Sequence, residues 1–375
     1  MNIPFNKPYM TGKEAHYIYQ AVYEKLHISG NGFFTKKCQS FFEEQYGFGK
    51  CLLTTSCTDA LEMSAILMRV QAGDEIIMPS YTFVSTANAF VLHGAKIVFA
   101  DCNENEPNIN PDEIEKLISP RTKAVVVVHY AGVACDMERI VEICNKHRIF
   151  LVEDAAQAID SFYKDKPLGS FGHLAAFSFH ETKNVISGEG GMLVINDKKF
   201  FARAEIIWEK GTNRSAFFRG ETDKYGWVDV GSSFLPSDMI AAFLFAQLEN
   251  LEDIQSRRKM LWCLYYDKLQ SLSERGKIAL PYIPAYASRN GHIFYLTCES
   301  LEMRTALIAF LKAKGIHAVF HYLSLHKSSF YADKHDGRVL PNTDKFADTL
   351  LRLPLYYEMS EEEVAYTAET VLSFR

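Results

Sequence analysis

Short apolar runs alternate with helical patterns over the first two thirds of the chain. The run Thr122 to Val128 is rich in β-branched residues and predicts a strand, while Asp136 to Lys146 has the apolar spacing of a helix. Strands separated by helices of this length favour a mostly parallel sheet covered on both faces. The other predicted strands are Cys51 to Thr54, Glu75 to Met78, Lys96 to Ala100, Phe150 to Glu153, Leu174 to Phe179 and Met192 to Ile195. The other predicted helices are Gly12 to Leu26, Thr35 to Tyr46, one that follows Thr58, Ser85 to His93 and Asp112 to Leu117.

The pattern changes near residue 250. A long apolar-striped run, Asp238 to Ser271, should pack on the large domain and lead out of it. Short strands and one helix follow, at Ile293 to Cys298, Arg304 to Lys314 and His317 to Tyr322. We therefore predict an α/β fold with a large domain over residues 1–250 and a smaller α+β domain over 251–375. The polar and aromatic stretch Ser324 to Asp344 has little periodicity and is predicted to be a substrate-side or mobile loop.

Composition limits the classes of partner. The 375 residues carry a formal net charge of −6, with no basic run that would suggest nucleic acid or an anionic membrane as partner. No window approaches the roughly 18 apolar residues of a membrane span, and the first residues lack an apolar signal region, so we expect a cytoplasmic protein. The eight cysteines include no Cys-x-x-Cys pair, and His317, His321 and His326 lack accompanying ligands, so no metal is expected.

Three polar features fall at the carboxyl ends of predicted strands, where ligands of such sheets gather. Lys183 lies on a loop between a strand and the glycine cluster Gly188 to Gly191, and is either structural or a nucleophile kept partly dry. Asp154 follows a strand and precedes a helical run, so it could cap a helix. Thr55 to Thr58 joins a strand to a helix, as a phosphate site or only a cap. Together these are the lysine, carboxylate and phosphate cradle that pyridoxal phosphate requires.

The same residues resemble the DegT/DnrJ/EryC1/StrS sugar aminotransferases. The resemblance runs over nearly the whole chain, through Leu353-Pro354-Leu355, and rests on four motifs in order. These are Thr55 to Thr58, Pro79 to Ala89, Val152 to Gln157, and Phe177 to Asn184 with Gly188 to Gly191. The resemblance implies fold type I of pyridoxal phosphate enzymes, a homodimer with active sites at its interface, and L-glutamate as amino donor.

The resemblance also implies a role for each matched residue. Lys183 would form the Schiff base and Asp154 would pair with the pyridinium nitrogen of the cofactor. Cys57, Thr58 and Ser178 would hold the phosphate, Phe83 would stack on the ring, and Gln157 would reach the phenolic oxygen. His326 and Tyr322 would lie over the sugar nucleotide. The sequence departs from the family at Ser233, where many members carry an asparagine that reaches the phosphate of the partner subunit.

Within the family, His129 to Cys135 and Lys210 to Ser215 resemble members that aminate dTDP-4-keto-6-deoxyglucose in surface polysaccharide synthesis. The implied product is dTDP-4-amino-4,6-dideoxyhexose of galactose configuration. Amination of a 3-keto sugar is the alternative, and dehydration is disfavoured because lysine is present where dehydratases carry histidine. A short-chain dehydratase or epimerase would need a glycine-rich dinucleotide loop before its Tyr-x-x-x-Lys pair, and the chain lacks that order. A non-catalytic ligand sensor is disfavoured by the intact Asp154 and Lys183.

Overall fold

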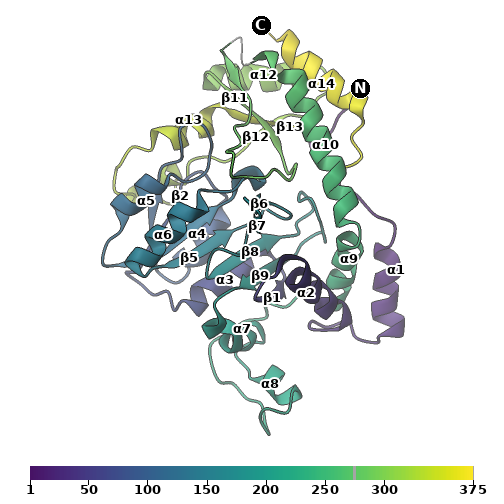
Figure 1. The fold of residues 1–375 in the computed structure, drawn as a ribbon, viewed down its shortest axis with the longest axis vertical. Coiled ribbons are helices and arrows are strands. Elements are labelled where there is room, and N and C mark those ends of the chain that lie inside the picture. Colours follow the sequence, from purple (N-terminus) through teal and green to yellow (C-terminus); the bar gives the residue numbers. More distant parts are fainter. Residues whose placement is uncertain (273–275, 375) are drawn as a thin grey trace.

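The chain folds around two β-sheets covered by helices (Figure 1). The computed structural model describes residues 1–272 and 276–374. The larger sheet has the strand order β1, β9, β8, β5, β4, β2, β3, and its strands run parallel except β9, which is antiparallel to both neighbours. Its strands are β1 (Lys50–Thr54), β2 (Glu75–Pro79), β3 (Lys96–Ala100), β4 (Thr122–Val128), β5 (Phe150–Asp154), β8 (Leu174–Ser178) and β9 (Gly191–Ile195). β6 (Phe162–Tyr163) and β7 (Lys166–Pro167) form a separate hairpin.

Helices cover both faces of the large sheet, as the apolar strands require. Successive residues of β4 enter different cores, because side chains alternate between the faces of a strand: Val125 and Val127 pack on one side, Ala124 and Val126 on the other. The first side is covered by α2 (Phe33–Tyr46), α5 (Pro111–Leu117), α6 (Met137–His147) and α9 (Asp238–Leu248), and α1 (Glu14–Tyr19) packs on α9. The second side is covered by α3 (Cys57–Leu67), α4 (Val84–Val91) and α7 (Phe201–Trp208).

The smaller sheet is antiparallel and lies over the carboxyl ends of the large sheet's parallel strands. Its order is β10 (Ile278–Ala279), β11 (Phe294–Cys298), β13 (Leu350–Leu353), β12 (Val319–Phe320). One face packs under α10 (Leu251–Leu269), α12 (Leu301–Ala313) and α14 (Glu361–Ser373), while α13 (Pro341–Thr349) lies on the other side. We call the small sheet with its helices the small unit, and the large sheet with its helices the large unit. Ile3 pairs with Ile316 and joins the core of the small unit, so the first residues of the chain lie against its C-terminal part.

The predicted α/β architecture, with a mostly parallel large sheet and a smaller C-terminal sheet, is confirmed. The strands from Lys96 to Ala100 and from Thr122 to Val128 agree with their predicted bounds at both ends. The division at residue 250 stays a prediction, and α10 begins beside it, at Leu251.

The run Asp238 to Ser271 consists of two helices, since α9 ends at Leu248 and α10 starts after Asn250. α9 packs in the core of the large sheet and α10 leads to the small sheet, as predicted for this run. Two other local predictions are wrong. No helix follows Asp154, since the next residues form turns. The stretch Ser324 to Asp344 is packed against the large sheet and does not form the predicted substrate-side or mobile loop. Tyr331 is buried there, and its hydroxyl accepts a hydrogen bond from the Ile97 N–H (2.6 Å), which occupies the open edge of β3.

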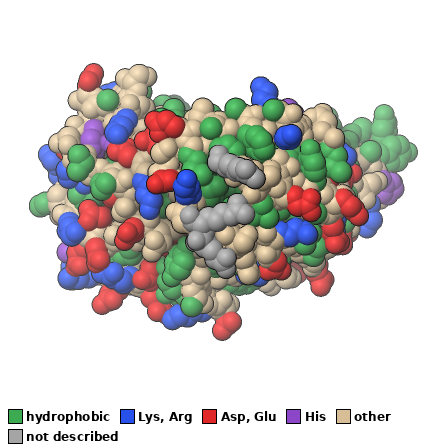
Figure 2. All heavy atoms as spheres, turned by 90° about the horizontal axis from the view of Figure 1, so that it is seen from above, with side chains coloured by type: hydrophobic (Ala, Val, Ile, Leu, Met, Phe, Trp, Pro, Cys, Tyr) green, Lys and Arg blue, Asp and Glu red, His purple; other side chains and the backbone are tan. Residues whose placement is uncertain are grey.

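The surface of the described residues shows no large area of one charge on the face drawn in Figure 2, where acidic and basic side chains alternate. Among the helices of the described residues, none has the length and apolar character needed to cross a membrane. The segment that contains α8 (Arg214–Phe218) extends from the body of the molecule below α7 (Figure 1).

The glycine that opens β9 allows the sheet to approach the loop between β1 and α3. A Cβ atom added at Gly191 would lie 2.3 Å from the carbonyl carbon of Ser56 and 2.4 Å from the nitrogen of Cys57. Both contacts are with backbone atoms, which cannot turn away as a side chain could. The position of the β1–α3 loop therefore depends on this glycine.

Replacing Gly191 with alanine should move that loop and lower the free energy of unfolding by about 1–3 kcal/mol, as overpacking does. Chemical denaturation of the variant measures the loss. Gly226→Ala is the matched control, because no atom lies within 4 Å of a Cβ added at Gly226 and its φ is not in the left-handed range. Equal stability of the two variants would show that the loop accommodates the methyl group.

Candidate active site

A cavity of about 620 Å³ lies between the carboxyl ends of the parallel strands and the small sheet. Its lining comes from the loop after β1, the loop after β2, the end of β5 and the β8–β9 loop, and from the small sheet by the residues before β11, those after β12, and β13. All the predicted cofactor residues line it: Cys57, Thr58, Phe83, Asp154, Gln157, Ser178 and Lys183. The topology that gathers strand ends at one edge of a sheet has thus brought together residues up to 126 positions apart, from Cys57 to Lys183.

Asp154, the last residue of β5, presents a buried carboxylate to the cavity. Its Oδ2 accepts a hydrogen bond from the Thr86 hydroxyl (2.7 Å), and its Oδ1 accepts one from the Ala156 N–H (3.2 Å). Burial raises the pKa of this carboxyl, while the hydrogen bonds and the positive charge of Lys183 oppose the shift. Because no helix follows Asp154, the capping role is excluded.

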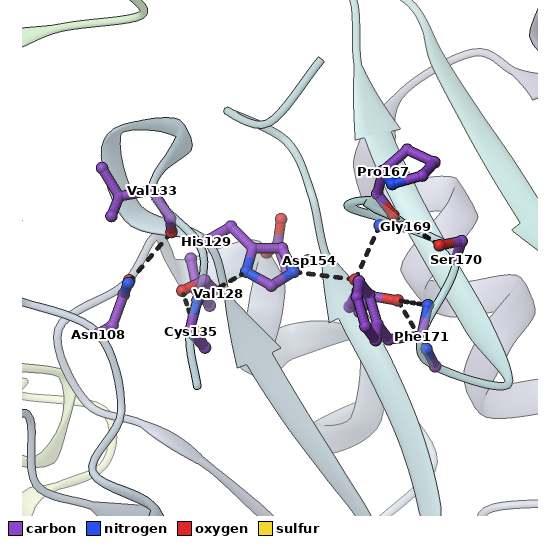
Figure 3. A network of polar contacts seen from close by, with 12 residues as sticks. Asn108, Val128, His129, Val133, Cys135, Asp154, Pro167, Gly169, Ser170 and Phe171 are labelled. Carbon is purple, nitrogen blue, oxygen red and sulfur yellow. Dashed lines mark hydrogen bonds and ion pairs between the residues drawn. The ribbon is translucent and has the colours of Figure 1, made fainter. Parts of the chain in front are cut away.

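The neighbouring residue, Glu153, projects from the opposite face of the same strand, because side chains alternate along a strand. It takes part in the polar network around His129, Gly169 and Phe171 (Figure 3). Its carboxylate accepts hydrogen bonds from His129 Nε2 (2.9 Å) and from the N–H groups of Gly169, Phe171 and Gly172 (2.6–2.7 Å). Burial alone would raise the pKa of Glu153, but these donors outweigh it and hold the pKa below its usual value. The end of β5 is therefore anchored on both sides of the sheet.

Lys183 lies on the β8–β9 loop with its amine toward the cavity. Its backbone N–H donates to the His180 carbonyl (2.8 Å), which shapes the turn. Within the part of the chain that the structure describes, its Nζ has no hydrogen-bond or ion-pair partner. Burial lowers the pKa of this amine, and the neighbouring Cys57 and Asp154 oppose that shift. Lys183 is therefore a half-buried amine available for chemistry.

An anion cradle lies at the first turn of α3. Ser56 caps this helix by accepting a hydrogen bond from the Asp59 N–H (3.1 Å). Among the described residues, the N–H groups of Cys57 and Thr58 have no acceptor and can bind a ligand. The Thr58 hydroxyl donates to the Ser85 hydroxyl at 2.8 Å. Ser178 adds a further hydroxyl from the end of β8. The two interpretations of this loop are compatible, since Ser56 is the cap and the N–H groups beside it stay the predicted phosphate donors.

The aromatic and amide side chains predicted near the cofactor also line the cavity. Phe83 is 56% exposed, which leaves its ring face available. Gln157 is buried, and its amide accepts from the Ala131 N–H (2.7 Å) and donates to the Tyr322 hydroxyl (2.9 Å). Tyr322 thus lines the cavity from the small unit, and its contact with substrate stays a prediction.

His326 does not line the cavity. It is 5% exposed, its Nδ1 is 2.8 Å from the Ser80 hydroxyl, and its Nε2 is 3.5 Å from Asp344. The predicted substrate contact fails because the segment around His326 packs against the loop after β2 instead of covering the site. Ser233 is exposed, pairs with Glu209 in an isolated bridge, and likewise does not line this cavity.

Sequence reasoning missed three residues of the site. Thr86 was part of a recognised motif, yet its hydrogen bond to Asp154 required the structure. His292 lines the cavity, and its Nδ1–H donates to the side chain of Asn184, the residue after Lys183, at 2.8 Å. Arg352 also lines the cavity from β13. A charged residue inside the apolar strand Leu350–Leu353 was the signal that could have identified it.

The comparisons with known proteins agree with this geometry. TlmJ of Streptoalloteichus hindustanus, an aminotransferase, superimposes with a TM-score of 0.91 at 28% identity over 99% of this chain and 98% of its own. Spr1654 of Streptococcus pneumoniae, named as a sugar aminotransferase and solved in its PLP form, gives 0.90 at 26% identity, with 99% and 98% covered. SpsC of Bacillus subtilis, named as a spore coat polysaccharide biosynthesis protein, is 32% identical over an alignment of 383 positions that covers 98% of this chain and 96% of SpsC.

The fold and the site define an aminotransferase. The model of the DegT/DnrJ/EryC1/StrS aminotransferase family matches residues 10–372, and the chain belongs to this family of sugar aminotransferases. Pyridoxal 5′-phosphate (PLP) is the cofactor, and the described residues fit it: they offer N–H groups without acceptors and hydroxyls for the phosphate, a buried carboxylate for the ring nitrogen, and an amine without a partner. The recognised family is confirmed.

Replacing Lys183 with alanine should lower turnover by at least the roughly 10²- to 10⁴-fold that a positioned acid–base group contributes. It should also remove the visible absorbance band of a lysine-linked cofactor, while the phosphate cradle still binds the cofactor. Lys312→Ala, an exposed lysine on α12, is the control and should retain both signals. Full activity of the Lys183 variant would show that the amine is structural.

Asp154→Asn separates a catalytic carboxylate from a structural one. In the cofactor-free protein, the raised pKa of Asp154 means that its ionised carboxylate lowers the stability of the fold as pH rises through that pKa. Removing the charge should therefore leave the variant at least as stable as the wild type at neutral pH. If Asp154 were a structural residue, loss of its hydrogen bonds would instead lower the free energy of unfolding by about 1 kcal/mol. Turnover with bound cofactor should fall about 10²- to 10³-fold. Thermal unfolding without cofactor and steady-state kinetics with it measure the two effects.

Proposed function

We propose that this protein transfers the amino group of L-glutamate to the keto group of a nucleotide sugar. The best candidate substrate is dTDP-4-keto-6-deoxyglucose, and the product is then dTDP-4-amino-4,6-dideoxygalactose. The observation that carries the proposal is the placement of Lys183 and Asp154 in one cavity beside the free first turn of α3. SpsC, named for polysaccharide biosynthesis, supports a sugar as the acceptor.

Each residue of the site has a distinct task in this reaction. Bound PLP supplies an electron sink that stabilises negative charge on the substrate carbon. Asp154 keeps the proton on the ring nitrogen of the cofactor, because its carboxylate is held in place by Thr86. Lys183 takes the proton from the α-carbon of the amino donor and returns one to the acceptor carbon, a task suited to an amine whose pKa burial lowers. The N–H groups of Cys57 and Thr58, with Ser178, hold the phosphate.

The choice of a 4-keto sugar rests on the motifs around His129 and Lys210. In the structure the first motif supports the site: Tyr130 hydrogen-bonds to His321 Nδ1 at 2.6 Å, and the Ala131 N–H fixes Gln157. The second motif begins where α7 ends, and Lys210 and Gly211 both have positive φ there. Amination at carbon 3 of the sugar is the second candidate, and product analysis distinguishes the two.

A homodimer is part of the proposal. The segment around α8 extends from the body and carries apolar side chains without cover: Trp227 is 86% exposed and Phe218 69%. Exposed apolar groups gathered on one projecting segment are typical of an interface, and a second copy of the chain would cover them. Sedimentation analysis of the holoenzyme measures the assembly.

Incubation of the holoenzyme with dTDP-4-keto-6-deoxyglucose and L-glutamate should give a new amino sugar at carbon 4 with the axial configuration of galactose. NMR of the purified product assigns both the position and the configuration. The Lys183→Ala variant is the control for uncatalysed chemistry. Amination of a 3-keto sugar in place of the 4-keto sugar would contradict the narrower proposal and leave the transamination intact.

A further inference from the structure

Arg352 enters the cavity from the wall opposite the cofactor residues. It lies on β13 between Leu351 and Leu353, which are buried in the core beneath α10, α12 and α14. Because side chains alternate along a strand, Arg352 projects from the other face, where it lines the cavity. Its guanidinium lies 4.6 Å from the ring centroid of Phe5, and its Nη2 donates to the Phe320 carbonyl at 3.3 Å.

This guanidinium lacks an anionic partner. Throughout residues 1–272 and 276–374, no carboxylate forms an ion pair with it, and its Nε is buried without a hydrogen-bond acceptor. Burial lowers the pKa of Arg352, while the hydroxyls of Tyr130, Tyr322 and Tyr81 oppose the shift. An unpaired cation in such a place is costly for the fold, so its presence indicates a partner from outside the chain.

The cofactor does not need Arg352 for its own phosphate. The donors for that group are at the first turn of α3, on the large unit, whereas Arg352 belongs to the small sheet. Both substrates of the proposed reaction carry oxyanions: L-glutamate has two carboxylates, and a nucleotide sugar has a diphosphate. A planar guanidinium binds either group through paired N–H donors.

We propose that Arg352 binds an oxyanion of a substrate, a carboxylate of the amino donor or a phosphate of the nucleotide sugar. The proposal rests on the proposed function for the identity of the two substrates. Arg352 is thus a substrate-binding residue on the wall that faces Lys183. The fork of the guanidinium, and not its charge alone, fixes the orientation of the bound group.

The test measures binding to the holoenzyme by titration calorimetry with two probes, 2-oxoglutarate and thymidine diphosphate. Arg352→Met removes the charge and keeps the length, and Arg352→Lys keeps the charge without the fork. Losing a charged hydrogen bond should weaken the affected probe by about 10- to 100-fold in Arg352→Met, with a smaller loss in Arg352→Lys. Arg289→Met is the matched control, because Arg289 also stacks on an aromatic ring, Trp262, but lies outside this cavity.

Weaker binding of 2-oxoglutarate alone assigns Arg352 to the donor carboxylate, and weaker binding of thymidine diphosphate alone assigns it to the nucleotide. Unchanged affinity for both probes, with the melting temperature of the wild type, overturns the proposal. The proposal is also overturned if both Arg352 variants bind both probes more weakly and melt at a lower temperature while Arg289→Met does neither. That result would show that Arg352 acts on the fold and not on the ligand. These readouts need no turnover. If the wild type aminates no keto sugar but binding still depends on Arg352, the proposed function fails and the oxyanion site stands.

Discussion

The site depends on keeping a carboxylate and an amine in the same partly dry cavity without an ion pair between them. Asp154 and Lys183 both line that cavity, yet within the described residues the carboxylate is bonded to Thr86 and Ala156, and the amine has no partner. A direct ion pair would satisfy each group and leave neither for a ligand. Burial instead shifts each pKa toward the neutral form, raising that of Asp154 and lowering that of Lys183. A cofactor that brings a protonated ring nitrogen and a carbonyl group meets both requirements.

Much of this arrangement could be predicted from the sequence. Strand ends in a parallel sheet converge, so Asp154, Lys183 and the loop before α3 could be placed together from the alternation of apolar runs alone. The family motifs then indicated roles. His326 could not be placed, because the segment Ser324 to Asp344 looks irregular in sequence, and only tertiary packing on β2 and β3 shows that it covers a sheet edge. The sequence also does not show where α9 ends and α10 begins, because the apolar stripe continues across Asn250.

Residues of the small sheet were the hardest to predict. Arg352 and His292 lie within or beside strands whose other residues are mostly apolar, and periodicity does not show which wall of a cavity such residues face. The burial of Leu351 and Leu353 determines the face of β13 from which Arg352 projects. What lies opposite that face depends on how the small sheet packs on the large one. The residues that the large sheet contributes to the cavity are therefore easier to predict from sequence than those of the small sheet, whose position depends on packing between the two units.

Hydrogen bonds between the two units hold these walls at a fixed separation. Gln157 donates to Tyr322 (2.9 Å), Tyr130 bonds to His321 (2.6 Å), and His292 donates to Asn184 (2.8 Å), and each pair joins a residue of the large unit to one of the small. Two of these residues, Gln157 and Asn184, are beside the cofactor position or next to Lys183 in the chain. These bonds therefore help to fix the gap between the part of the cavity lined by Lys183 and the part lined by Arg352. A ligand that contacts both residues must match that gap.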